Sequence, residues 1–210
     1  MERKHIITIS GKPGSGKSST ADKVAEILGY TRHSSGDMVR NILQKEKMTL
    51  AEYNKNAKSN HSLDTKVDEY LRNLRYEKNI VVDPRLGFYW LPESFKVYLD
   101  LDIQVATVRI FSDAMDNSLR SKTGEGVSSL EMVTKQVKDR VETEQRRFKK
   151  LYNIDPFNTT HFDLVIDTSR HTPQTVALAI FDNYRKWQNT DDWKPVRSSI
   201  PLGFSFKNQY

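Results

Sequence analysis

Short apolar runs alternate along the chain with apolar residues at helical spacing. The run at 6–9 is rich in β-branched residues and predicts a buried strand, and the run at 80–82 has the same character. After the first run, apolar residues recur one turn apart over 17–28, and Gly29 follows where a helix would end. The start of the chain therefore reads as a strand, a glycine-containing loop and a helix.

The same patterns predict the remaining elements. Strands are expected at 6–9, 30–33, 80–82, 95–101 and 162–167. Helices are expected at 17–28, 37–46, 62–77, 103–115, 128–152 and 173–188, with one more opening at the capping box 49–52. Strands that alternate with helices indicate a parallel α/β sheet. Because ligands bind beyond the carboxyl ends of such strands, the loops after them are the places for a site.

The boundaries between elements follow local signals. Ser128 begins a capping box before the long charged helix, and the pair 172–173 places a threonine cap before a proline in the first helical turn. The segment 116–128 has few apolar residues and is expected to be a mobile loop. Residues 189–210 show no period and form a tail of unassigned role.

Composition narrows the classes of protein. The chain has 210 residues and no cysteine, which excludes disulfides, thiolate catalysis and zinc-thiolate sites. Neither a signal peptide nor a membrane-spanning apolar run is present, so we expect a cytoplasmic protein without a membrane partner. The net charge of +6 is compatible with nucleic acid, an anionic membrane or phosphorylated small ligands. Half of this excess lies in the expected helix 130–152, which has seven Lys and Arg against four Asp and Glu.

The loop after the first strand carries the most specific motif. Residues 11–18 match the phosphate-binding pattern G-x-x-x-x-G-K-[ST] at every fixed position. Glycines let successive N–H groups point at one anion, Lys17 reaches the β- and γ-phosphates, and Ser18 holds Mg²⁺. The guanine signature Asn-Lys-x-Asp does not occur, which favours a small ATP-dependent kinase. The ATP-binding candidates here are Gly11, Gly14, Ser15, Gly16, Lys17, Ser18 and Ser19.

Two motifs at the ends of the next strands resemble those of nucleoside monophosphate kinases. Residues 35–40 read S-G-x-x-x-R, and the resemblance implies that Ser35, Gly36 and Arg40 bind the acceptor monophosphate. Residues 82–85 read Val-Asp-Pro-Arg. By the same resemblance, Asp83 orients Mg²⁺ together with Ser18, and Arg85 is a second clamp on the acceptor phosphate. A guanidinium suits this role because it can bind two phosphate oxygens at once.

The long charged helix adds a third resemblance. Arg140, Glu144 and Arg147 fit R-x-x-x-[DE]-x-x-R and share one helix face. Together with RVETEQRRFKKLYNID and FDLVIDTS, this segment is similar to archaeal-type cytidylate kinases. The resemblance implies that Arg140 and Arg147 act on the transferring phosphates beside Lys17, and that Glu144 contacts the acceptor sugar.

The sequence departs from that family at two places. Bacterial members have Asp after the second clamp arginine, where it helps to read cytosine, whereas this chain has Leu86, as the archaeal type does, and Pro84 before the clamp. The helix at 103–115 has Ala106 at one of two positions that often carry arginine. Arg109 remains as the candidate beside the ATP base.

The resemblance implies a P-loop three-layer fold with a five-stranded parallel sheet. One kinase domain would span 1–188: its core 1–34, 79–115 and 160–188, its acceptor-binding region 35–78 and its lid 116–155. The expected reaction moves the ATP γ-phosphate to CMP or dCMP with Mg²⁺, in a monomer without a nucleic-acid partner. Two alternatives stay open. One is another small P-loop kinase, adenylate kinase-like or with a different acceptor, and the other is a non-enzymatic, ATP-dependent RNA-binding or regulatory protein.

Overall fold

The computed structural model describes residues 5–45, 47, 62–116 and 129–198. Its centre is one parallel sheet in the order β2-β3-β1-β4-β5-β6. The strands are β1 (Ile6–Gly11), β2 (Thr31–His33), β3 (Ile80–Val82), β4 (Phe95–Asp100), β5 (Leu164–Asp167) and β6 (Val196–Ser198). The expected parallel α/β fold is confirmed.

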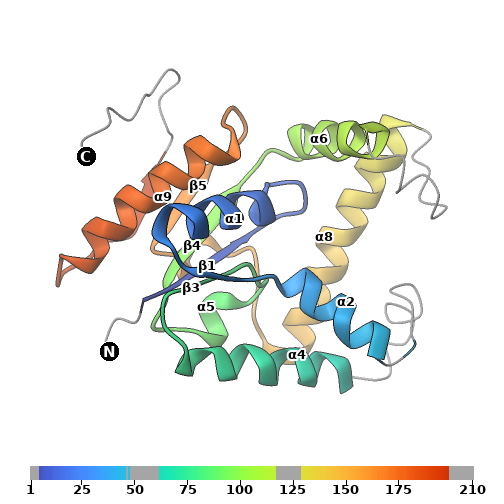
Figure 1. Cartoon of the computed structure of the whole chain (residues 1–210). Coiled ribbons are helices and arrows are strands. Elements are labelled where there is room, and N and C mark those ends of the chain that lie inside the picture. The colour runs from blue at the N-terminus through green and yellow to red at the C-terminus, as the bar shows by residue number, and fades with distance from the viewer. Residues whose placement is uncertain (1–4, 46, 48–61, 117–128, 199–210) are drawn as a thin grey trace.

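Helices cover both faces of this sheet (Figure 1). On one face, α1 (Lys17–Leu28) and α9 (Pro173–Gln188) pack side by side. On the other lie α4 (Ser62–Asn73), α5 (Gly87–Trp90) and α8 (Leu130–Tyr152). The elements α2 (Ser35–Lys45) and α6 (Ile103–Asp116) complete the set, with short 3₁₀ turns at Leu74–Tyr76 and Thr159–His161.

Three buried clusters join the layers. The largest lies between the sheet and α1 and α9 and includes Val97, Leu99 and Ile180. On the opposite face, Phe148 of α8 packs with Leu86, Tyr98 and other apolar residues. Leu71 and Leu74 belong to a third cluster beside β1 and β3. Each strand is thus buried on both sides, which explains why the strands appear as continuous apolar runs rather than alternating patterns.

The sheet has six strands, so the expectation of five was wrong. The sixth, β6, lies in the segment 189–210 and pairs in parallel with β5. Trp193 precedes it, packs edge-on against Phe95 at 6.0 Å and donates to the Asp163 carbonyl. Three residues of strand are too short for a period in the sequence, and tertiary packing decides their structure.

Several helix boundaries also differ from expectation. The cap of α8 is Ser129, whose Oγ accepts from Met132 N at 3.2 Å, and not Ser128. The expected helix 62–77 becomes α4 followed by the 3₁₀ turn, and α5 was not expected because four residues show no period. The capping box at 49–52 and nearly all of the loop 116–128 lie outside the described residues. None of the described helices is long and apolar enough to cross a membrane.

Candidate active site

The loop between β1 and α1 is shaped to hold an anion. Gly14 and Gly16 have φ of 77° and 80°, in the left-handed region where other residues are strained. A Cβ on Gly11 would lie 2.4 Å from the Leu99 carbonyl oxygen, so only glycine fits there. No side chain caps the first turn of α1, which leaves its N–H groups available to phosphate. Ser15 Oγ is buried with no hydrogen-bond partner among the described residues, as expected of a group that awaits a ligand.

Lys17 lies at the base of this loop. Its Nζ donates to the carbonyl oxygens of Gly11 at 2.9 Å and Lys12 at 2.7 Å. Burial lowers the pKa of Lys17 well below its ordinary value, and the neighbouring charge of Arg85 adds to the effect. A bound polyphosphate would favour the protonated amine again. The loop therefore holds a cation whose charge is costly until an anion arrives.

Ser18 and Asp83 meet at the carboxyl ends of neighbouring strands. Ser18 Oγ donates to Asp83 Oδ2 at 2.9 Å, although 65 residues separate them. Ser35 N donates to the other carboxylate oxygen at 2.9 Å and so fixes the start of α2 against β3. Asp83 is buried, and its carboxylate joins the phosphate-binding loop to the expected acceptor-binding region.

Arg32 on β2 is a site residue that sequence reasoning missed. Its Nη2 lies 2.8 Å from Asp83 Oδ2, and its Nε donates to Asp22 at 3.0 Å. The position just before the Ser-Gly motif was a usable signal, because an arginine at the end of a buried strand must face charge or solvent. Arg32 balances the buried carboxylate of Asp83.

Arg85 and Glu144 form the central ion pair. Arg85 Nε lies 2.7 Å from Glu144 Oε2, and Nη2 lies 3.2 Å from Oε1. Arg85 Nη1 also donates to Gly11 O at 3.2 Å, and Arg140 Nε donates to Glu144 Oε1 at 3.1 Å. Burial alone would raise the pKa of Glu144, but the two arginines hold it below its ordinary value. The long helix is thus tied to the phosphate-binding loop through two charged side chains.

The remaining expected residues lie around this centre. Arg40 is exposed on α2 and pairs with Asp37 one turn away, where it holds the pKa of Asp37 below its ordinary value. Arg147 lies over the ring of Phe148 at 4.7 Å. Arg109 Nη2 donates to the Thr168 carbonyl at 2.6 Å, after β5, on the far side of the phosphate-binding loop.

The exposed and half-buried members are on the solvent side. Ser19 is exposed on the first turn of α1, and Gly36 lies beside the Arg40 guanidinium in α2. The side chain of Arg140 is 61% exposed, so it can turn towards a substrate without losing buried contacts. Site residues thus fall into a fixed centre and two exposed arginines, Arg40 and Arg140.

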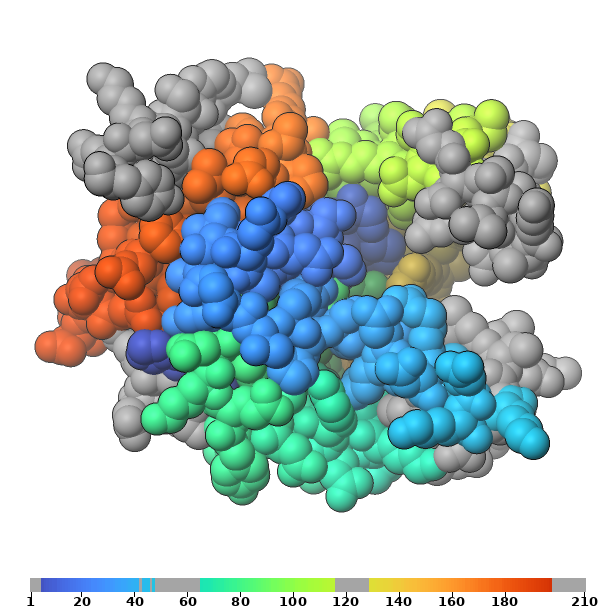
Figure 2. All heavy atoms as spheres, viewed as in Figure 1, coloured from blue at the N-terminus to red at the C-terminus, as the bar shows by residue number. Residues whose placement is uncertain are grey.

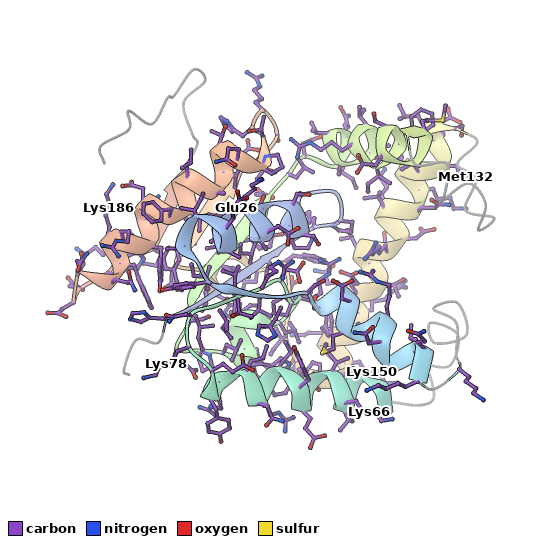
Figure 3. All side chains as sticks on the ribbon, viewed as in Figure 1. Glu26, Lys66, Lys78, Met132, Lys150 and Lys186 are labelled. Carbon is purple, nitrogen blue, oxygen red and sulfur yellow. The ribbon has the colours of Figure 1, made fainter. Side chains whose placement is uncertain are left out.

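The molecule is hollowed between α2 and α6, with α8 behind (Figure 2). The helix α8 runs from Met132 beside α6 to Lys150 near α4 and so connects both sides of the hollow (Figure 3). A second hollow of about 670 Å³ lies between α1, α2 and α4, and Ser18, Arg32, Arg40 and Lys66 are among its lining residues. Lys17, Arg85 and Glu144 do not line it.

The sequence of residues 6–170 matches the cytidylate kinase-like family. The chain belongs to this family. A cytidylate kinase of Sulfurisphaera tokodaii is 35% identical over 178 residues, which cover 83% of this chain and 92% of that protein. The predicted resemblance is confirmed, and the chain is an ATP-dependent phosphotransferase by membership, against the non-enzymatic alternative.

Two further similarities need narrower statements. A protein of Lacinutrix mariniflava named S-adenosylmethionine-dependent nucleotide dehydratase is 32% identical over 86% of this chain, but the match covers only 36% of that protein. A shikimate kinase from Acinetobacter baumannii superposes with a TM-score of 0.57 at 14% identity, covering 88% of this chain and 95% of that one. The latter similarity confirms the P-loop kinase fold and carries no information on the substrate.

Proposed function

We propose that this member of the family transfers the γ-phosphate of ATP to CMP or dCMP. The observation that carries the proposal is the pair Arg85–Glu144, because it places an acceptor clamp 3.2 Å from the Gly11 carbonyl of the phosphate-binding loop. A donor phosphate on that loop and an acceptor phosphate on Arg85 would then be neighbours. Family membership supports a nucleoside monophosphate as the acceptor.

The residues around Ser18 fit Mg²⁺. This cation prefers oxygen ligands and usually keeps several waters. Ser18 Oγ and Asp83 Oδ2 are such oxygens, 2.9 Å apart. Asp83 already accepts hydrogen bonds from Ser18 and Ser35 and pairs with Arg32, so it would hold the ion through water while Ser18 binds it directly. When bound, Mg²⁺ neutralises charge on the β- and γ-phosphates.

Phosphoryl transfer requires position and charge more than covalent chemistry from the protein. Lys17 gives up its carbonyl bonds for the β- and γ-phosphates, and Arg109 lies near the ATP base. Arg85 and Arg40 orient the acceptor phosphate. A phosphate monoester is already anionic near neutral pH, so no general base is needed.

Closure completes the site in this proposal. Arg40 is exposed and paired with Asp37, so α2 with the region 35–78 must move to bring it to the acceptor. Arg140 and Arg147 belong to the lid region 116–155 and stabilise the transferring group, while Glu144 shares Arg85 with the acceptor and contacts its sugar. Exclusion of water prevents ATP hydrolysis.

A panel of acceptors tests the proposal. ATP and Mg²⁺ are supplied with CMP, dCMP, UMP, AMP or shikimate, and ADP formation is followed. CMP or dCMP should give the highest kcat/KM, and Lys17→Ala should remove the activity from the same preparation. Turnover of shikimate with no nucleoside monophosphate would contradict the proposal and favour a different small P-loop kinase.

A further inference from the structure

One face of α8 carries a row of residues four apart, namely Arg140, Glu144, Phe148 and Tyr152. Glu144 holds Arg85, and Phe148 is buried in a cluster with Leu86, the next residue after the clamp. The row therefore begins at the proposed phosphate clamp and continues past the position where bacterial relatives carry the residue that reads cytosine.

The row ends at a carboxylate for which the proposed reaction has no use. Tyr152 Oη donates to Asp68 Oδ2 at 2.5 Å, and Asp68 is only 8% exposed. Asp68 lies on α4, within the region expected to bind the acceptor. Aromatic rings surround Tyr152: the centroid of Trp90 is 5.6 Å away and that of Tyr89 is 6.0 Å away. A buried carboxylate is costly, and a retained one beside aromatic surfaces suits recognition of a polar, planar group.

The distance along α8 matches such a ligand. Eight residues separate Glu144 from Tyr152, a rise of about 12 Å. This length is comparable with that of a nucleoside monophosphate whose phosphate lies at Arg85. Because Asp68 and Arg85 contact the same helix face through Tyr152 and Glu144, one extended molecule could reach both.

We propose that Asp68, oriented by Tyr152, accepts a hydrogen bond from the exocyclic amine of the acceptor base. The inference rests on the proposed function and names the residue that takes over from the acidic residue replaced by Leu86. It assigns Asp68 as the residue that determines the base and Tyr152 as a positioning residue.

The chemistry distinguishes two pyrimidines of nearly equal size. Cytosine presents an amino group at C4, which a carboxylate can accept from, whereas uracil presents a carbonyl oxygen there. A carboxylate facing that oxygen would place two acceptors together and leave both without a donor. An ionised carboxylate has about four acceptor positions, of which the bond from Tyr152 uses one.

Asp68→Asn tests the assignment because an amide can donate to uracil and keeps the size of the side chain. We expect the ratio of kcat/KM for CMP to that for UMP to fall by at least about tenfold, the usual scale for one base contact. The KM for ATP should stay within about twofold, because Asp68 is far from the phosphate-binding loop in the proposal. Tyr152→Phe should lower the same ratio by less, because the carboxylate remains but loses its orientation.

Asp182→Asn is the matched control. Asp182 is an exposed aspartate on α9 paired with Lys186, so its amide variant should leave the ratio and the KM values unchanged. Thermal unfolding of each variant separates stability from selectivity. If Asp68 and Tyr152 only tie α4 to α8, both variants will lower the Tm or the rates for CMP and UMP equally, and the unchanged ratio overturns the inference.

The two proposals fail in different ways. If the wild-type protein phosphorylates no nucleoside monophosphate, the proposed function is wrong and the base assignment is wrong with it. If the wild type prefers CMP and Asp68→Asn keeps that preference, the base assignment alone is wrong. Should Asp68→Asn not fold, Tyr152→Phe decides, and a preference equal to that of the wild type overturns the inference.

Discussion

Arg85 and Glu144 bind each other through two contacts, at 2.7 and 3.2 Å, across 59 residues of sequence. One follows β3 and the other lies in the middle of α8, so the pair joins the sheet to the helix behind the hollow. Two nitrogens of one guanidinium meet two oxygens of one carboxylate, which fixes orientation as well as distance. An acceptor phosphate would find Arg85 already directed towards the phosphate-binding loop.

Glu144→Gln should lower the free energy of unfolding by about 1–2 kcal/mol, less than a fully buried pair would lose, because both side chains keep some contact with solvent. Urea unfolding at neutral pH measures this difference. Arg146→Gln, an exposed change on the same helix, is the control. A loss no larger than that of the control would show that the pair does not stabilise the fold.

The contribution of Glu144 to stability should also depend on pH. Its pKa in the folded protein is lowered, so the stabilisation is present above the unfolded value of about 4.3 and is lost as pH falls through the folded value. The difference in unfolding free energy between wild type and Glu144→Gln should therefore be constant above about pH 5.5 and shrink below about pH 4. A difference that grows on acidification would contradict the direction of this shift.

Lys17→Ala should lower kcat by at least about a hundredfold, because Lys17 would neutralise charge that develops on the transferring phosphate. The substitution also removes a buried amine with an unfavourable charge, so the Tm of the ligand-free protein should not fall much. Steady-state kinetics and thermal unfolding together check the claim. Lys23→Ala, an exposed lysine on the same helix, should leave kcat unchanged.

Arg40→Ala and Arg109→Ala should affect opposite substrates. Loss of Arg40 should raise the KM of the nucleoside monophosphate at least about tenfold with little change for ATP, since a charged hydrogen bond contributes about 1.5–3 kcal/mol. Loss of Arg109, which binds carbonyls after β5, should act chiefly on ATP. Initial rates with each substrate varied in turn separate the two effects. If Arg40→Ala acts mainly on ATP, the proposed division of the site is wrong.

Removal of divalent cations with a chelator should abolish turnover, and added Mg²⁺ should restore it. Asp83→Asn should raise the concentration of Mg²⁺ at half-maximal rate by about tenfold or more, the scale seen when an outer ligand is changed. Ser18→Ala should act in the same direction, because the two oxygens lie 2.9 Å apart. Full activity in the chelator would remove the metal from the proposal.

The sequence alone predicted most of the sheet and the phosphate-binding loop. Strands such as 80–82 are buried on both faces, so their apolar runs are unambiguous, and the left-handed glycines before Lys17 leave a fixed motif. The strand β6 could not be predicted, because Val196–Ser198 is held by pairing with β5 and by Trp193 rather than by its own pattern. The helix α5 was missed because Gly87–Trp90 is only one turn long.

What the sequence determined by itself is local: apolar period, glycine positions and the order of charged residues along each helix. These properties act between near neighbours, so they can be read from neighbouring letters. Which charges meet was decided only by the tertiary structure. Arg85 finds Glu144, Arg32 finds Asp83 and Tyr152 finds Asp68 because the parallel sheet and α8 bring distant segments together, and no spacing in the sequence encodes those distances.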